Sequence, residues 1–136
     1  MKPCALCELG AGREAGRIVY RDQHAFAFFP LHQDVRGHTV VAPLVHVATW
    51  SELGAEVVSG LFLAAQRVSE RLCSRLSAAA VNVLFAGGPT AQQSVPHFHV
   101  HVLPRWPGDG VDAWPKLPGY HGDREGDFRA VTGSEG

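Results

Sequence analysis

Three histidines alternate with apolar residues in the last third of the chain. Residues 97–103 read HFHVHVL, which places His97, His99 and His101 two residues apart. Side chains at i, i+2 and i+4 of a β-strand share one face. We therefore expect the imidazoles to form a row on one side of a strand and the apolar residues to pack on the other. The simpler interpretation is a polar row facing solvent, but such faces usually carry Lys, Glu or Thr.

A row of imidazoles is suited to proton transfer and to nucleophilic attack. Histidine titrates at a pKa of about 6.5, so it can give or take a proton near neutrality. An imidazole can also attack phosphorus and form a phosphoramidate-like bond that water can break. Neighbouring imidazoles shift each other's pKa, so one can be neutral while another is charged.

A Gly-rich loop precedes the histidine row and is a candidate phosphate loop. Gly87 and Gly88 permit close approach of the backbone, and Gln93 and Ser94 add side-chain donors. Taken alone, the glycines are more typical of a plain turn. Their position directly before the histidine row favours a phosphate site.

Cys4 and Cys7 have the spacing of half a zinc site, which His46 and His97 could complete. A fortuitous cysteine pair is the alternative. A thioredoxin-like redox motif is disfavoured because the pair does not open a helix after a strand. Cys73 falls within a helical pattern, where we expect it to be a small buried residue.

The periodicity along the chain predicts an α+β fold with a mainly antiparallel sheet and one long helix. Residues 1–16 have a loop-like composition, and the segment after Pro104 is rich in Gly and Pro. We expect a domain over residues 1–105, with 106–136 as an irregular C-terminal extension of it that lies on the surface or partly across a partner. The helix is predicted over 51–76, and strands over 18–20, 25–29, 37–42, 79–85 and 97–103.

The composition excludes several classes of protein. The chain has 136 residues, of which 46% are hydrophobic and 18% charged, with a net charge of -1. These values fit one folded domain and argue against global disorder and against nucleic-acid binding by bulk charge. No apolar run reaches the roughly 20 residues of a membrane span. Because no secretory signal or disulfide framework is evident, we expect a cytoplasmic protein.

These motifs resemble those of the histidine triad (HIT) family of nucleotide hydrolases and transferases. Residues 97–103 match its alternating histidine signature, and residues 37–46, GHTVVAPLVH, match a second segment. The Cys4–Cys7 pair, followed by IVY at 18–20, is similar to the N-terminus of family members. The resemblance extends from Cys4 to about Arg105, and the segment near Trp114 is similar to bacterial members.

The resemblance implies specific roles for the histidines. His99 would be the nucleophile that takes up the nucleoside monophosphate, His101 would contact phosphate and help the leaving group, and His38 would orient the nucleophile. A histidine rather than a glutamine at position 101 favours the hydrolase branch of the family over the uridylyltransferases. The protein would then hydrolyse nucleotide conjugates, either nucleoside phosphoramidates or dinucleoside polyphosphates.

The resemblance also implies a ligand set and an assembly. Several bacterial relatives carry a closed structural zinc, one per chain, and the matching ligands are Cys4, Cys7, His46 and His97. Family members are usually homodimers. The candidate substrate-binding residues are Gln93, Ser94, Gly87 and Gly88 at the phosphate and Phe28 and Leu31 around the base.

Three positions depart from the family pattern. Pro30 replaces an aspartate that commonly holds ribose hydroxyls, Ala86 replaces an asparagine, and Gln92 replaces a glycine. We expect the nucleophile chemistry to survive these changes and ribose recognition to weaken. The alternative functions are a nucleotide-binding regulatory protein with little turnover and a purely metal-binding module.

Overall fold

A five-stranded antiparallel sheet forms the centre of the computed structural model, which describes residues 4–133. The strand order is β1-β2-β3-β5-β4, so β5 lies between β3 and β4, and its pairing with β3 joins two strands that are not consecutive in sequence. The predicted α+β fold with a mainly antiparallel sheet is confirmed. The strands are β1 (Ile18–Arg21), β2 (Ala25–Phe28), β3 (Thr39–Pro43), β4 (Ala80–Leu84) and β5 (Val100–Arg105).

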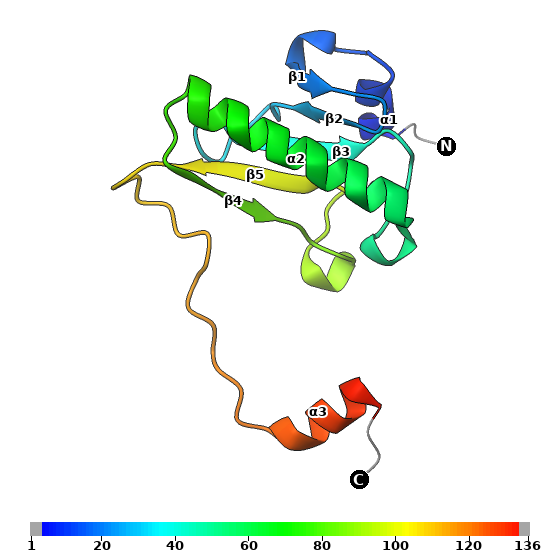
Figure 1. The fold of residues 1–136 in the computed structure, drawn as a ribbon, viewed down its shortest axis with the longest axis vertical. Coiled ribbons are helices and arrows are strands. Elements are labelled where there is room, and N and C mark those ends of the chain that lie inside the picture. Colours follow the sequence, from blue (N-terminus) through cyan, green and yellow to red (C-terminus); the bar gives the residue numbers. More distant parts are fainter. Residues whose placement is uncertain (1–3, 134–136) are drawn as a thin grey trace.

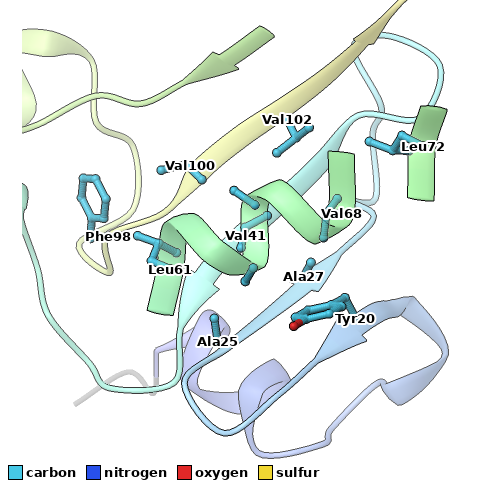
Figure 2. Close-up of a cluster of buried hydrophobic side chains, with 12 residues drawn as sticks. Tyr20, Ala25, Ala27, Val41, Leu61, Val68, Leu72, Phe98, Val100 and Val102 are labelled. Carbon is cyan, nitrogen blue, oxygen red and sulfur yellow. The ribbon is translucent and has the colours of Figure 1, made fainter. Parts of the chain in front are cut away.

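Helix α2 (Ala55–Arg75) lies across one face of the sheet (Figure 1). Leu61, Val68 and Leu72 recur at helical spacing and are buried against the strands, as Figure 2 shows. The helix begins four residues later than the predicted start at Ser51. Ser51 belongs to a separate 3-10 turn, Trp50–Glu52, and Gly54 immediately precedes the helix.

Helix α1 (Ala5–Gly10) contributes to the core cluster on the other face, where sequence reasoning expected only a loop. Its Leu6 and Leu9 are buried in a second core cluster with Phe26 and Phe28 of β2. Six residues are too few to show a helical period, so the sequence gives little signal for this helix. The consequence is that Cys4 and Cys7, at the start of α1, lie against the sheet.

Strand β5 begins at Val100 and not at His97 as predicted. Its last pair with β3 joins Val41 to Val100. Before that point the Phe98 amide donates to the Val47 carbonyl at 2.6 Å, beyond the end of β3 at Pro43. The alternation nevertheless continues through residues 97–99, because Phe98 is fully buried in the core cluster beneath α2.

The C-terminal segment leaves the sheet at a tightly bonded corner. Arg105 donates to both carboxylate oxygens of Asp109 at 2.9 and 3.0 Å, and Trp106 Nε1 donates to the Leu76 carbonyl at 3.2 Å. The chain then extends away from the sheet to helix α3 (Arg124–Thr132) (Figure 1). The composition predicted an irregular extension, and α3 is the exception within it. Its N-cap is Asp123, whose side chain accepts from the Gly126 amide at 2.9 Å.

Candidate functional site

His99 and His101 lie together on the face of the sheet opposite α2. Their ring centroids are 5.1 Å apart, and both side chains are partly buried. Phe98, Val100 and Val102, which alternate with the histidines, are fully buried against α2. The alternating pattern therefore separates a reactive face from a packing face, as a period of two requires.

The protonation pattern of the His99 ring is set by the main chain. Its Nδ1 lies 2.9 Å from the His97 carbonyl oxygen, which can only accept a hydrogen bond. His99 therefore carries its proton on Nδ1 and donates it to His97. In the neutral ring, Nε2 is then the unprotonated nitrogen with a free lone pair.

The buried His38 pairs with the partly buried His101 where β3 lies beside β5. His38 Nε2 lies 2.9 Å from His101 Nδ1, and the two rings are 5.1 Å apart. Within residues 4–133, His38 Nδ1 is buried without a hydrogen-bonding partner. A buried N–H without a partner is rarer than a buried acceptor without one. We therefore assign the proton of His38 to Nε2, which donates to His101 and leaves the His101 proton on Nε2.

Gly37 sets the path of the main chain directly before His38. Its φ is +74°, and a Cβ there would lie 2.8 Å from Pro104 Cγ. Both the backbone conformation and the space require glycine.

Burial keeps both members of the pair neutral near pH 7. Burial, with smaller contributions from His99 and His38, lowers the pKa of His101 to about 4. Burial also lowers the pKa of His38. Asp34 opposes both shifts, and sequence reasoning missed it because only its position four residues before His38 pointed to it. His101 can thus offer a neutral N–H to an oxyanion.

The candidate phosphate loop lies beside a pocket of about 460 Å³. The loop turns at Gly88, whose φ is +99°, and continues through a 3-10 turn at Pro89–Ala91. Gly87 packs near Trp50, an aromatic residue that the sequence patterns did not single out. The pocket is lined by Ala48, Thr49, Gly88, Pro89, Gln93, Ser94 and Pro96.

The two polar residues of this loop differ in their hydrogen bonding. The side-chain amide of Gln93 forms hydrogen bonds with three main-chain groups. It accepts from the Gly88 N–H and donates to the carbonyls of Ala48 and Val95. Ser94 is exposed, and in the described part of the chain its hydroxyl has no hydrogen-bonding partner. Ser94 is therefore free to bind a phosphate oxygen.

The residues expected near the base differ sharply in exposure. Phe28 is 5% exposed and stacks on Phe26, with the Arg17 guanidinium over its ring at 5.3 Å. Leu31 is 77% exposed. Pro30 lies between these positions and offers no side-chain acceptor to a ribose.

Cys4, Cys7, His46 and His97 converge, and their ligand atoms all lie within 4.8 Å of one another. Three of the separations are Cys4 Sγ to His97 Nδ1, 3.4 Å, Cys7 Sγ to His46 Nδ1, 3.3 Å, and Cys7 Sγ to His97 Nδ1, 3.5 Å. A tetrahedral zinc site with bonds of 2.0–2.3 Å has edges of about 3.3–3.8 Å. Three of the six ligand-atom separations in this group, the metal cluster, therefore match the edges of a tetrahedral zinc site.

The His97 ring is oriented for metal binding by a second hydrogen bond. Its Nε2 lies 2.9 Å from the Pro43 carbonyl, so it carries the proton, and Nδ1 presents a lone pair to the cysteines. Metal-binding histidines typically donate their other N–H to such a carbonyl. The side chain is fully buried, and its ring lies between the other metal-cluster residues and the end of β3.

Comparisons with known proteins agree with this geometry. The HIT domain family matches residues 12–108. "Protein hit" of Bacillus subtilis (strain 168) is 33% identical over 111 residues, covering 81% of this chain and 77% of that protein. The bifunctional bis(5'-adenosyl)-triphosphatase/adenylylsulfatase FHIT of Arabidopsis thaliana is 34% identical over 92 residues, covering 68% of this chain and 51% of that protein.

Solved structures extend the match over nearly the whole chain. A HIT family member from Bacillus subtilis has a TM-score of 0.80 at 30% identity, covering 98% of this chain and 94% of that one. A zinc-bound histidine triad family protein from Mycobacterium smegmatis has a TM-score of 0.75 at 28% identity, covering 96% and 91%. With its histidine row, neutral histidine pair and metal cluster in the arrangement described above, the chain belongs to the HIT family.

Proposed function

We propose that this protein hydrolyses nucleotide conjugates through a nucleotidylated His99. The observation that carries the proposal is the hydrogen bond from His99 Nδ1 to the His97 carbonyl, which leaves Nε2 as a nucleophile. The family relationship supports a nucleotide substrate. A relative named as a bis(5'-adenosyl)-triphosphatase supports hydrolysis of a bond to phosphorus.

The reaction divides into two displacements at phosphorus. In the first, the His99 Nε2 lone pair forms a bond to the phosphorus of a nucleoside monophosphoryl group, and the bond to the leaving nitrogen or oxygen breaks. The leaving atom keeps the electron pair and takes up a proton. In the second, water attacks the same phosphorus, the bond to Nε2 breaks, and nucleoside monophosphate is released with a proton.

Neighbouring residues stabilise the developing charge. The neutral His101 N–H donates to a phosphate oxygen or to the leaving group, and His38 holds the His101 ring through the 2.9 Å bond. Ser94 and the backbone of Gly87 and Gly88 contact the remaining phosphate oxygens. Phe28 and Leu31 border the base.

The metal cluster would hold a structural zinc, one per chain, with Cys4, Cys7, His46 and His97 as its ligands. Four protein ligands would leave the metal no open position for substrate. Through these ligands, α1 would be joined to the segment after β3, and His97 would be held in place. His97 also accepts the His99 hydrogen bond, so a His97 ring held by a metal would keep the nucleophile oriented, and the metal itself would take no part in the reaction.

The active form is a homodimer that uses the face around β4 and α2. β4 is an edge strand of the sheet, and large apolar side chains on β4, on α2 and on the segments next to them are exposed. An exposed apolar patch of this kind marks an interface. The patch consists of Trp50 (41% exposed), Phe62 (36%), Leu63 (44%), Val83 (40%) and Phe85 (43%).

The cytoplasm is the proposed location, without a membrane or nucleic-acid partner. Among residues 4–133, none of the helices combines the length and apolar character needed to cross a bilayer. The net charge of -1 offers no excess of cations for a phosphate backbone.

A nucleotide-binding regulatory protein with little turnover is the second candidate. The observation that favours it is the lack of polar side chains at Pro30 and Ala86, two positions near the proposed substrate. Such a protein would bind a nucleotide through the loop without transferring it to His99.

Single-turnover labelling separates the two functions. Enzyme in excess is mixed with a nucleoside phosphoramidate radiolabelled at phosphorus and quenched in alkali, because a phosphohistidine bond is labile in acid. Transient label on the protein, absent from the His99→Ala variant, is the expected result. Binding without label or product formation would instead establish the regulatory function.

A further inference from the structure

Gln93 has no free donor to offer a substrate. Its Oε1 accepts from the Gly88 amide at 2.8 Å, and its Nε2 donates to the Ala48 carbonyl at 2.6 Å and the Val95 carbonyl at 2.9 Å. A side-chain amide has two N–H donors, and both are used. The side chain is also partly buried, so these bonds are shielded from water.

The same side chain closes the phosphate loop on itself. The Gln93 side chain accepts from the Gly88 main-chain N–H, and the main-chain N–H of Gln93 donates to the Gly88 carbonyl at 3.1 Å. Gly88 and Gln92, at the two ends of the enclosed turn, have positive φ values of 99° and 73°. Glycine adopts a positive φ readily, but a residue such as Gln92 seldom does in a free chain, so this turn needs fixed ends.

Gln93 also ties the loop to the segment that carries His46. Two other bonds join the same two stretches of chain: Phe98 N to Val47 O at 2.6 Å and His97 Nε2 to Pro43 O at 2.9 Å. The bond from Gln93 to Ala48 is the third and lies at the phosphate-loop end of this series. It fixes the position of the loop relative to the segment 97–99, which carries His99.

We infer that Gln93 is a positioning residue, which holds the phosphate loop at a fixed distance from His99 through main-chain bonds, and that Ser94 supplies the side-chain contact to phosphate. The inference rests on the proposed function of the same site. It assigns Gln93 a different role from the phosphate contact that the sequence predicts. A direct ligand would need a free N–H, and the described geometry leaves none.

The first test is amide hydrogen exchange in the substrate-free protein. Gln93→Met keeps the side-chain length and removes all three bonds, so exchange at the Gly88 amide should accelerate at least tenfold. Gln93→Glu keeps an acceptor for that amide but places a carboxylate oxygen against the Ala48 and Val95 carbonyls, so it should accelerate the exchange as well. The control is Gln92→Asn, an exposed neighbour at a positive φ that Asn tolerates. Unchanged Gly88 exchange in the Met variant overturns the inference, and this result does not depend on activity.

The second test compares leaving groups. Gln93→Met should slow turnover by about ten- to a hundredfold, as a misplaced binding loop does. The factor should be the same for a phosphoramidate of a basic amine and for an ester of an acidic phenol. A loss that grows with the pKa of the leaving group would mean that Gln93 contacts the leaving atom, which overturns the inference. Failure of the wild-type protein to turn over either substrate would count against the proposed function and leave the exchange test valid.

Discussion

The main-chain oxygen of His97 accepts a hydrogen bond from His99 Nδ1 at 2.9 Å, and His97 is itself the buried histidine of the metal cluster. The residue that holds the metal therefore also sets the tautomer of the adjacent histidine. Residues 97–99 therefore contribute both to the metal cluster, which stabilises the fold, and to the nucleophile. The two contributions can be tested separately, by removing the metal and by replacing His99.

Replacing His99 with Ala should abolish turnover and leave the fold intact. The side chain is partly exposed and contributes one hydrogen bond, so its removal leaves the core clusters unchanged. Without the nucleophile the rate should fall by several orders of magnitude. The measurement is steady-state hydrolysis together with thermal unfolding, and His121→Ala in the exposed C-terminal extension is the matched control. Substantial residual hydrolysis would show that another group is the nucleophile.

Metal analysis of protein purified without chelator should find one zinc per chain. Chelation should lower the melting temperature more than it lowers the activity of the molecules that stay folded, because the site is structural. Cys4→Ser should reduce zinc content and stability, whereas Cys73→Ser, on α2 away from the cluster, should change neither. A protein without metal, or one with a Cys4–Cys7 disulfide, would contradict the assignment.

Stability should fall as the pH drops from about 6.5 toward 4. The pKa of His101 is about 4 in the folded state, below its ordinary value of 6.5, so the unfolded chain binds more protons in this window. The slope from one such proton is at most about 1.4 kcal/mol per pH unit. His101→Gln removes this titrating imidazole. The dependence of the unfolding free energy on pH, measured by denaturant titration, should therefore become flatter in the variant. Parallel profiles for the variant and the wild type would refute the burial argument.

Ribose and deoxyribose substrates should differ by about tenfold or less. Pro30 provides no acceptor for the sugar hydroxyls, and a buried hydrogen bond is worth roughly 0.5–1.5 kcal/mol. Hydrolysis of matched ribo- and 2',3'-dideoxyribonucleoside phosphoramidates measures the ratio. Pro30→Asp should increase the preference for ribose, and His32→Asp, at an exposed position of the same loop, should not. A hundredfold preference of the wild-type protein for the ribose substrate would contradict the prediction of weak ribose recognition.

Sedimentation at micromolar concentration should show a dimer. Leu63→Glu places a charge within the exposed apolar patch beside β4 and should shift the protein toward monomer. Ser74→Glu introduces the same charge at an exposed polar position near the C-terminal end of the same helix, far from the patch, and should leave assembly unchanged. A wild-type protein that sediments as a clean monomer would rule out this interface.

Much of the fold could be predicted from local patterns. The periodicity of Leu61, Val68 and Leu72 indicated α2, and short apolar runs indicated the strands, because a buried stripe or face requires that spacing wherever it occurs. Helices α1 and α3 escaped prediction. The first is too short to show a period, and the second is exposed throughout most of its length and depends on the Asp123 cap.

The candidate site, like the fold, could be predicted only in part from the sequence. The sequence by itself determined which residue types face together at positions 97, 99 and 101, since alternation along an extended chain fixes the face. Only the tertiary structure decided their partners. His38 meets His101 because β3 pairs with β5, and His97, His99 and Gln93 bond to main-chain carbonyls at Pro43, His97 and Ala48. A carbonyl acceptor has no residue identity in a sequence, so its part in setting tautomers and holding a loop emerges only when the chain is folded.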